Sequence, residues 1–365
     1  MTTTRAIAAV LREQDGPYRL ETIELDPPGP GELLVRIVGT GMCHTDVLPR
    51  SPVAFSPPPI ITGHEGAGVV EAVGPDVEGV AVGDHVVLSF DSCGTCPNCL
   101  RGVPAYCDTF LVRNLLGRRV DGTTAAHDAD GHEVASRWFG QSSFATHCLA
   151  TARNAVVVDR DLPLELLGPL GCGVLTGAGS VLVALGVEAG ASIVVFGAGA
   201  VGLSAVMAAK ALGARAIVAV DVHANRLELA TELGATCVVE GTADDVVAQV
   251  QAHIGHGADY AFDTTGNVAV ITNAIAALRM GGHCGLVGIQ TEPLELDIVG
   301  SLGKTVSNIL EGAADPHEVI PQLIGWWREG RFPFDRLIET FPLSEIDAAE
   351  QASANGRVVK PVLLP

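Results

Sequence analysis

The sequence predicts an α/β protein of two domains, in which a β-rich domain precedes a doubly wound parallel sheet. The chain of 365 residues is longer than one hydrophobic core usually serves. Short β-branched runs separated by Gly, Pro and Asp fill the first part, and strands alternate with helical segments after Cys172. Apolar residues make up 48% and charged residues 18%, which is typical of a folded globular protein.

The β-rich part extends from about Ile7 to Asp161. Its clearest strands are the β-branched runs at 33–38, 68–73 and 85–88. No long helix is expected here. The polar stretch 113–135 predicts only loop or short elements.

The second part shows the strand–helix alternation of a parallel sheet with crossover helices. Strands are expected at 192–196, 216–221, 237–240, 260–263 and 283–288, and helices at 200–212, 224–233, 244–253 and 269–280. The segment from about 309 predicts a helix at 316–329 and extended pieces at 337–341 and 358–364. We expect this closing segment to return to the first domain.

The charge balance argues against nucleic-acid and membrane-surface functions. The formal net charge is −20, so the long-range field repels phosphate backbones and anionic lipids. The N-terminal residues lack the pattern of a signal peptide, and a cytoplasmic location is expected. The nearly uncharged run 192–212 has the length of a membrane span, but its central glycines favour a strand, a turn and a buried helix.

Four of the nine cysteines form C-x2-C-x2-C-x7-C. This spacing can place four thiolates around one structural zinc ion, and an iron–sulfur cluster is the weaker alternative. A zinc-ribbon nucleic-acid adaptor is also conceivable, but only Arg101 supplies positive charge nearby. We interpret the lobe, at about 91–109, as a structural clip. Its ligands are Cys93, Cys96, Cys99 and Cys107.

Three further residues of the kinds that bind metals lie far apart in the sequence, each beside glycines. They are Cys43, His64 and Cys172. Two thiolates and an imidazole would leave the fourth position of a tetrahedral zinc ion open, as catalysis requires. Each residue alone is weak evidence, since a cysteine between glycines is more often a small buried side chain.

A G-x-G-x-x-G motif follows the expected strand 192–196 and opens the expected helix. Its glycines, Gly197, Gly199 and Gly202, permit a tight turn and close approach of a pyrophosphate to a helix N-terminus. Asp221 ends the next strand, where a carboxylate can accept hydrogen bonds from both adenosine ribose hydroxyls. NAD is therefore favoured over NADP, although Arg226 could reduce this preference for NAD.

Together these motifs resemble the zinc-containing medium-chain alcohol dehydrogenase family over essentially the whole chain. The family signature G-H-E-x-x-G-x5-G matches Gly63, His64, Glu65, Gly68 and Gly74. The resemblance implies a GroES-like β-rich catalytic domain at 1–173 and 310–365, and a Rossmann NAD-binding domain at 174–309. It also implies two zinc ions per subunit, one catalytic and one structural.

The resemblance assigns the catalytic zinc to Cys43, His64 and Cys172, the ligand types already known for alcohol dehydrogenases. Glu65 is implied beside the metal, as a transient ligand or a residue behind the ligands. Asp46 should accept a hydrogen bond from His64, and a carboxylate in that position fixes the tautomer of a metal-bound imidazole.

Further roles are also implied by the resemblance alone. His44 and Lys360 would reach the cofactor pyrophosphate, and Thr176 and Val201 would flank the nicotinamide. Thr45 would take the proton of the alcohol. Many relatives complete this relay with a histidine, but Leu48 stands at that position here. We therefore expect proton release to water without an imidazole.

Within the family, the chain resembles the benzyl (aryl) alcohol dehydrogenase branch. The stretches that carry this resemblance are 141–146, 166–173, 309–312 and 330–335. Primary aryl or allylic alcohols such as benzyl, cinnamyl or geranyl alcohol are implied, with the aldehyde as product. The alternatives are aliphatic, secondary or glutathione-linked alcohols. A homodimer or homotetramer is implied as well.

Overall fold

The chain folds into a β-rich unit and a parallel-sheet unit in the computed structural model, which describes residues 2–52 and 54–365. The first unit extends to Gly173 and adds Asp315–Pro321 and Leu337–Pro365, and the second comprises Val174–Ala314 and Gln322–Arg336. This division falls at residue 173, where the boundary was expected. The expectation that all of 310–365 returns to the first unit is wrong, because 310–314 and 322–336 pack in the second. Arg331, for example, donates from Nη2 to the Ala211 carbonyl at 2.8 Å.

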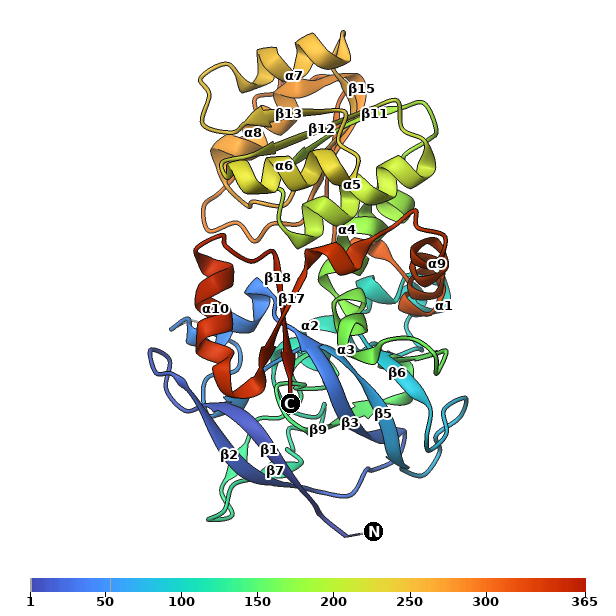
Figure 1. The fold of residues 1–365 in the computed structure, drawn as a ribbon, viewed down its shortest axis with the longest axis vertical. Helices are drawn as coiled ribbons and strands as arrows, with labels where there is room; N and C mark the ends of the chain where they lie inside the picture. Colours follow the sequence, from blue (N-terminus) through green and yellow to red (C-terminus); the bar gives the residue numbers. More distant parts are fainter. Residues whose placement is uncertain (1, 53) are drawn as a thin grey trace. The chain divides into compact units, whose positions relative to one another are not determined.

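The first unit is built from two mostly antiparallel sheets (Figure 1). One has the order β4-β1-β2-β7-β8, and the other has the order β10-β6-β5-β3-β18-β17, with β9 also paired to β3. The strands are β1 (Thr4–Leu11), β2 (Tyr18–Leu25), β3 (Glu32–Gly41), β4 (Ile60–Ile61), β5 (Glu65–Val73), β6 (His85–Leu88), β7 (Ala126–His127), β8 (Glu133–Val134), β9 (His147–Thr151), β10 (Ala155–Val158), β17 (Ile338–Pro342) and β18 (Lys360–Leu364).

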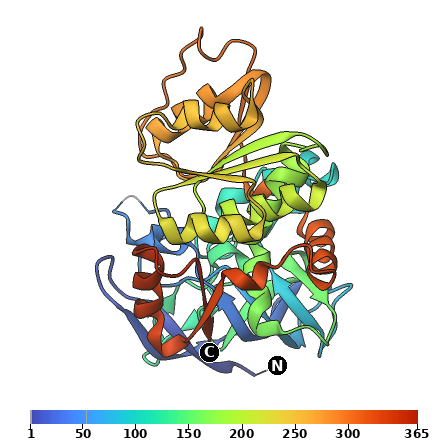
Figure 2. The same ribbon diagram turned by 45° about the horizontal axis from the view of Figure 1, so that its top comes forward.

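Helices in the first unit are short, as the sequence predicts for its N-terminal part. They are α1 (Pro97–Leu100), α2 (Phe110–Leu115), α3 (Leu164–Leu167) and, near the C-terminus, α10 (Ile346–Ala354). The sequence analysis missed α10, which contacts β18 and is drawn in red in Figure 2. The stretch 113–135 contains only short elements, as expected.

Close packing of β3 on β5 explains one glycine of the G-H-E-x-x-G signature. A Cβ on Gly68 would lie 2.1 Å from the Arg36 carbonyl oxygen of the paired strand. No real side-chain carbon approaches backbone so closely, and β5 therefore requires glycine at this position. Because His64 and Glu65 stand at the start of β5, this pairing also fixes their place beside β3.

The second unit contains a six-stranded parallel sheet in the order β13-β12-β11-β14-β15-β16. Its strands are β11 (Ser192–Phe196), β12 (Ala216–Asp221), β13 (Cys237–Glu240), β14 (Ala258–Asp263), β15 (Leu278–Leu286) and β16 (Thr305–Asn308). The helices are α4 (Gly173–Gly179), α5 (Ala200–Leu212), α6 (Ala224–Leu233), α7 (Val246–Ile254), α8 (Val268–Ala277) and α9 (Pro316–Arg328), of which α4 and α9 also carry residues of the first unit.

Helices cover both faces of this sheet (Figure 1). Helix α5 contacts α6 on one face, and α7 contacts α8 on the other. The strand order is that of the doubly wound dinucleotide-binding fold, so the predicted fold class is confirmed. The sheet core is almost entirely aliphatic and includes Val194, Val218, Ile271 and Leu286.

Two details of the second unit differ from the expectation. The helix expected at 269–280 ends at Ala277, and Leu278 already begins β15 by pairing with Ala258. Strand β16 was not predicted, because its residues are polar or half-buried and show no apolar run. Both differences arise from strand pairing, which local sequence does not display.

The run 192–212 consists of β11, a glycine turn and α5, in agreement with the sequence analysis. Among the described residues, no single helix is sufficiently long and apolar to span a membrane. The bent pair Leu164–Gly171 and Gly173–Ala184 meets the criteria by length and composition alone.

Candidate active site

Cys43, His64, Glu65 and Cys172 come together in the first unit. Their ligand atoms all lie within 4.8 Å of one another, although 129 residues separate the two cysteines in sequence. His64, Glu65 and Cys172 are buried, and Cys43 is half-buried. The side chains that the sequence analysis predicted as catalytic zinc ligands therefore form one cluster.

The ends of three elements position the ligands. Cys43 lies between the end of β3 and the 3-10 helix His44–Arg50, and His64 directly precedes β5. Cys172 follows the short helical turn Gly168–Gly171. That turn packs tightly on the sheet, since a Cβ on Gly171 would lie 2.0 Å from the Leu88 carbonyl oxygen.

Asp46 orients the imidazole of His64, as expected. His64 Nδ1 lies 2.8 Å from Asp46 Oδ1, and both side chains are buried. The other ring nitrogen, Nε2, is buried and has no hydrogen-bond partner among the residues that the structure describes. A buried, unsatisfied imidazole nitrogen beside two thiols is what a zinc ion would complete, so the residues fit this metal.

The Lys360 ammonium holds the carboxylate of Glu65. Nζ donates to both carboxylate oxygens, at 2.8 and 2.9 Å, and to the Met42 carbonyl at 3.0 Å. Both side chains are buried. The sequence analysis placed Lys360 at the cofactor pyrophosphate and did not foresee this pairing; that cofactor role stays a prediction.

The electrostatics favour a thiolate at Cys43. The neighbouring Cys172 and the nearby His64 lower the pKa of Cys43 well below the usual value, against the effect of burial. Burial opposes the charged form of Lys360, but the Glu65 carboxylate raises the pKa of Lys360 above its usual value. A thiolate is the form in which cysteine binds zinc.

An aromatic group that the sequence analysis missed covers the cluster. The ring of Phe139 stacks on His64 with 4.4 Å between centroids, and Phe110 meets Phe139 edge-on at 6.2 Å. Phe139 has a positive φ of 48°, a conformation that bulky residues rarely adopt. Its neighbour Gln141 donates to the His64 carbonyl at 2.9 Å and so fixes the backbone of the ligand.

The four-cysteine lobe is a second cluster in the first unit. The ligand atoms of its cysteines lie within 4.8 Å of one another. The sulfur of Cys99 is 3.9 Å from that of Cys93 and 3.5 Å from that of Cys96. Sulfurs that share a tetrahedral zinc ion at about 2.3 Å are roughly 3.8 Å apart. The Thr95 amide lowers the pKa of Cys93 to about 5, so this ligand is readily ionised.

In the second unit, a pocket of about 300 Å³ lies at the carboxyl ends of the parallel strands. Its walls include Gly197, Gly199, Asp221 and Arg226, all predicted as cofactor residues. Gly199 caps α5, and a Cβ there would meet only Arg226, at 3.8 Å. This open cradle at a helix N-terminus fits a dinucleotide pyrophosphate.

Glycine is also required inside α5. A Cβ on Gly202 would lie 1.8 Å from the Gly197 carbonyl oxygen, so the helix could not approach the loop. Asp221 Oδ2 accepts a hydrogen bond from the Ala198 amide at 2.6 Å and thereby ties the loop to β12. Asp221 Oδ1 lies 2.9 Å from His223 Nδ1, a contact not predicted.

The remaining predicted cofactor residues occupy different places. Thr176 donates to the buried Glu311 at 3.1 Å. The backbone of Val201 lies close to Gly177, the residue after Thr176, because a Cβ on Gly177 would lie 2.0 Å from the Val201 carbonyl oxygen. His44 is exposed in the first unit. Their contacts with the nicotinamide and the pyrophosphate stay predictions.

Comparisons with known proteins agree with these two sites. Residues 29–160 match the alcohol dehydrogenase GroES-like domain family, and residues 200–326 match the zinc-binding dehydrogenase family. Geraniol dehydrogenase of Castellaniella defragrans is 47% identical over 365 aligned positions, which cover 98% of this chain and 97% of that protein. The chain belongs to the zinc-containing medium-chain alcohol dehydrogenases.

Two solved structures are similar to this dehydrogenase over nearly their full length. An alcohol dehydrogenase zinc-binding domain protein from Burkholderia ambifaria has a TM-score of 0.97 and 46% identity, covering 100% of both chains. Benzyl alcohol dehydrogenase from Acinetobacter calcoaceticus has a TM-score of 0.95 and 41% identity, covering 99% of both. The enzyme is thus an NAD- and zinc-dependent alcohol dehydrogenase, and its two metal-ligand clusters match that chemistry.

Proposed function

We propose that this dehydrogenase oxidises primary aryl and allylic alcohols to aldehydes. The observation that carries the proposal is the stacking of Phe139 on His64, with Phe110 behind it, which places aromatic carbon against one of the metal ligands. Relatives named for geraniol and for benzyl alcohol, at 47% and 41% identity, support the same substrate class. An apolar, aromatic surrounding suits a flat unsaturated substrate.

Each of the clustered residues has a defined task in this reaction. Zinc, when bound, supplies Lewis-acid polarisation of the alcohol oxygen, and NAD accepts the hydride. Cys43, His64 and Cys172 would hold the metal, and Asp46 keeps the His64 ring in the ligating tautomer. Lys360 holds Glu65 in place beside the ligands.

The hydroxyl of Thr45 is proposed to take the proton from the alcohol. Its Oγ1 lies 3.7 Å from the Cys43 sulfur, next to the metal-ligand cluster. Leu48 offers no imidazole to continue the relay, so the proton is proposed to pass from Thr45 through the cofactor ribose to water. A Thr45→Ser variant should keep most of kcat and Thr45→Ala should lose most of it. Equal loss in both variants would contradict a hydroxyl role.

The deciding experiment follows NAD reduction with benzyl alcohol and geraniol. Wild type is compared with Cys43→Ala at equal zinc content of the four-cysteine lobe. We expect activity only in the wild type, because the variant keeps the fold and the lobe but lacks a ligand. Activity in both proteins would refute the catalytic-zinc assignment.

A substrate panel separates the alternatives. The kcat/KM values for benzyl alcohol and geraniol are compared with those for ethanol, propan-2-ol and the glutathione adduct of formaldehyde. An apolar pocket distinguishes neighbouring substrates by only about 1–3 kcal/mol per methylene, so several aryl and allylic alcohols should react. Preference for one of the last three alcohols would contradict the proposal.

A cytoplasmic homo-oligomer is proposed as the working form. Strand β16 is an edge of the parallel sheet, and the segment before it exposes Ile298, Val299 and Leu302. Exposed apolar side chains beside an unpaired strand edge favour association with a second copy. Sedimentation should show an oligomer in the wild type and a smaller species in Val299→Asp, and a monomeric wild type would contradict this.

A further inference from the structure

A hollow of about 390 Å³ in the first unit is lined by none of the predicted zinc ligands or cofactor residues, and it borders the four-cysteine lobe through Asp91. Four arginines line it: Arg113, Arg118, Arg119 and Arg137. Only three carboxylates, those of Glu32, Asp91 and Asp121, line it with them. Four guanidinium groups thus face one hollow, in a chain whose net charge is −20, and Glu133 balances Arg118 from outside the lining.

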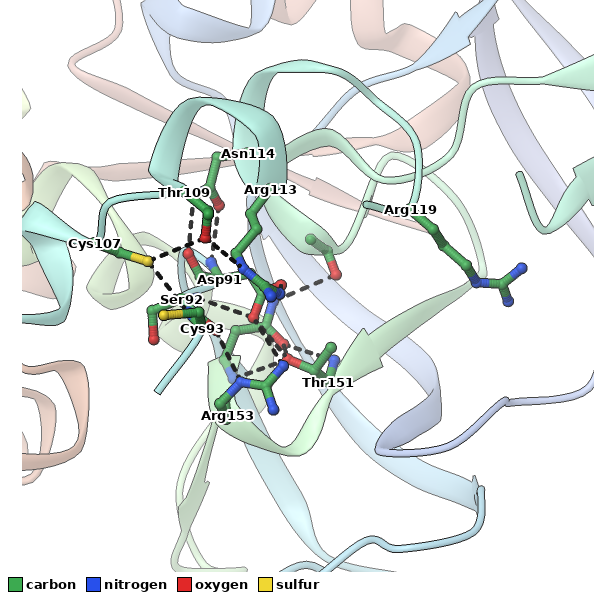
Figure 3. A network of polar contacts seen from close by, with 12 residues as sticks. Asp91, Ser92, Cys93, Cys107, Thr109, Arg113, Asn114, Arg119, Thr151 and Arg153 are labelled. Atoms are coloured by element: carbon green, nitrogen blue, oxygen red, sulfur yellow. Dashed lines mark hydrogen bonds and ion pairs between the residues drawn. The ribbon is translucent and has the colours of Figure 1, made fainter. Parts of the chain in front are cut away.

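Two of the arginines are firmly paired. Arg119 binds Glu32 through two parallel hydrogen bonds, at 2.8 and 2.9 Å. Arg113 donates from Nη1 to Asp91 Oδ2 at 3.0 Å. Figure 3 shows Arg113 and Arg153 gathered about Asp91, with Arg119 on the neighbouring segment. These two pairs account for both buried carboxylates.

Arg137 is left incompletely satisfied. Its side chain is 6% exposed, yet only Nη1 donates among the described residues, to Glu32 at 3.3 Å and to the Leu149 carbonyl at 3.5 Å. Both distances exceed the usual range for such bonds. A guanidinium carries five N–H donors. Nε and Nη2 of Arg137 are not among the buried, unsatisfied atoms of the described residues, so they are open to the hollow that Arg137 lines.

Arg118 completes the wall from the more exposed side. Its side chain is 38% exposed, and its partners are Glu133 at 2.7 Å and the Gly122 carbonyl at 3.3 Å. Arg118 and Arg119 belong to the polar stretch 113–135, to which the sequence analysis assigned no role. Here this stretch contributes three of the four arginines.

We propose that this hollow binds a small anion with two or more negative charges, of phosphate or carboxylate chemistry. The anion would accept hydrogen bonds from the Nε and Nη2 donors of Arg137, for which the described residues show no acceptor. Planar guanidinium groups bind both oxyanion types through paired hydrogen bonds. Arg137 forms the buried end of the site, and Arg118 forms the exposed rim.

The test is titration calorimetry on the zinc-replete enzyme with NAD at saturation, so that the dinucleotide pocket is already filled. Inorganic phosphate and tricarballylate are the two probes, each at ionic strength matched with sodium chloride. We expect saturable binding of one anion per chain. Phosphate binding alone identifies a phosphate site, and tricarballylate binding alone identifies a polycarboxylate site.

Three variants locate the binding. Arg137→Gln should weaken it about tenfold or more, the loss expected for a hydrogen bond to a charged group. Arg118→Gln should weaken it several-fold, and its half-exposed position protects folding. Arg19→Gln is the control, because Arg19 is 56% exposed and pairs with Glu13 outside the hollow. Absence of saturable binding, or equal binding in all variants, would overturn the proposal.

Discussion

The carboxylate of Asp46 accepts three hydrogen bonds at the metal-ligand cluster. The Cys43 and Gly63 amides donate at 3.0 and 2.9 Å, and His64 Nδ1 lies at 2.8 Å. Replacement by Asn removes the charge that fixes the tautomer of His64. We expect Asp46→Asn to lower zinc affinity or kcat/KM by about 10–100-fold. Metal analysis after dialysis and steady-state kinetics measure both effects.

Asp84→Asn provides the control for that variant. Asp84 also accepts a backbone hydrogen bond, from Ala81 at 2.9 Å, but in an exposed turn. It should retain zinc and activity. If Asp46→Asn and Asp84→Asn lost zinc and activity to the same extent, the loss in Asp46→Asn would reflect reduced stability of the fold and not a change at the metal site.

Asp221 should set the preference for NAD. Its carboxylate would accept from the ribose hydroxyls and would repel a 2′-phosphate. We expect Asp221→Asn to weaken NADH binding by about tenfold or more. The difference between the dissociation constants for NADH and NADPH should become smaller. Fluorescence titration with both nucleotides measures this, and an unchanged ratio of their dissociation constants would contradict it.

For individual residues, the sequence predicted the functional side chains that belong to short motifs. The zinc ligands and the cofactor glycines stand in local patterns with a chemical reason for each residue. Phe139 and the pairing of Lys360 with Glu65 could not be predicted. Lys360 and Glu65 lie 295 residues apart, and only the pairing of β18 in the sheet brings them together.

The close approach of α5 to the glycine loop is a property of that element. Gly202→Ala should cost stability and cofactor affinity, because the new Cβ would lie 1.8 Å from the Gly197 carbonyl oxygen. The two nearest atoms are backbone atoms of Gly197, which cannot move aside as a flexible side chain could. Urea unfolding and NADH titration measure the two losses.

Gly325→Ala is the matched control within α9. A Cβ there would meet no atom within 4 Å. Alanine is favoured over glycine in a helix interior, so stability should rise by about 0.4–1 kcal/mol. If Gly202→Ala and Gly325→Ala had the same stability and the same affinity for NADH, the close contact at Gly202 would not explain the expected losses.

Elements with strong periodicity were predicted well. Strands β11 and β12 and helices α5 and α6 have the expected bounds, because each pairs an apolar pattern with a glycine or polar boundary. Strand β16 and helix α10 were missed. Strand β16 has no apolar run, and its conformation depends on pairing with β15.

For the whole molecule, the four-cysteine lobe should act as a removable clip. Arg153 ties it to the domain by donating to the Ser92 carbonyl at 2.8 Å, and Asp91 accepts from Arg113. Cys96→Ser should lower the zinc content from two ions to one per chain and reduce Tm, because metal binding contributes to folding. Calorimetry and metal analysis measure this.

The same site should lose zinc in acid. Protons compete with zinc for the four thiolates, so zinc retention should decline as the pH falls. The Thr95 amide lowers the pKa of Cys93 to about 5, which favours this thiolate against protonation. Cys237→Ser, in β13 outside the lobe, is the control and should keep both ions. Loss of zinc from that control would contradict the assignment.

The sequence by itself determined the chemistry: the two zinc sets, the dinucleotide motif, the two-domain α/β fold and the family. These depend on residue types at short, fixed spacings, which local sequence displays directly. Tertiary structure alone decided that 322–336 joins the second unit, that Phe139 covers His64, and that four arginines line one hollow. Such contacts join distant segments through strand register and packing, and neither is specified by any one stretch of the chain.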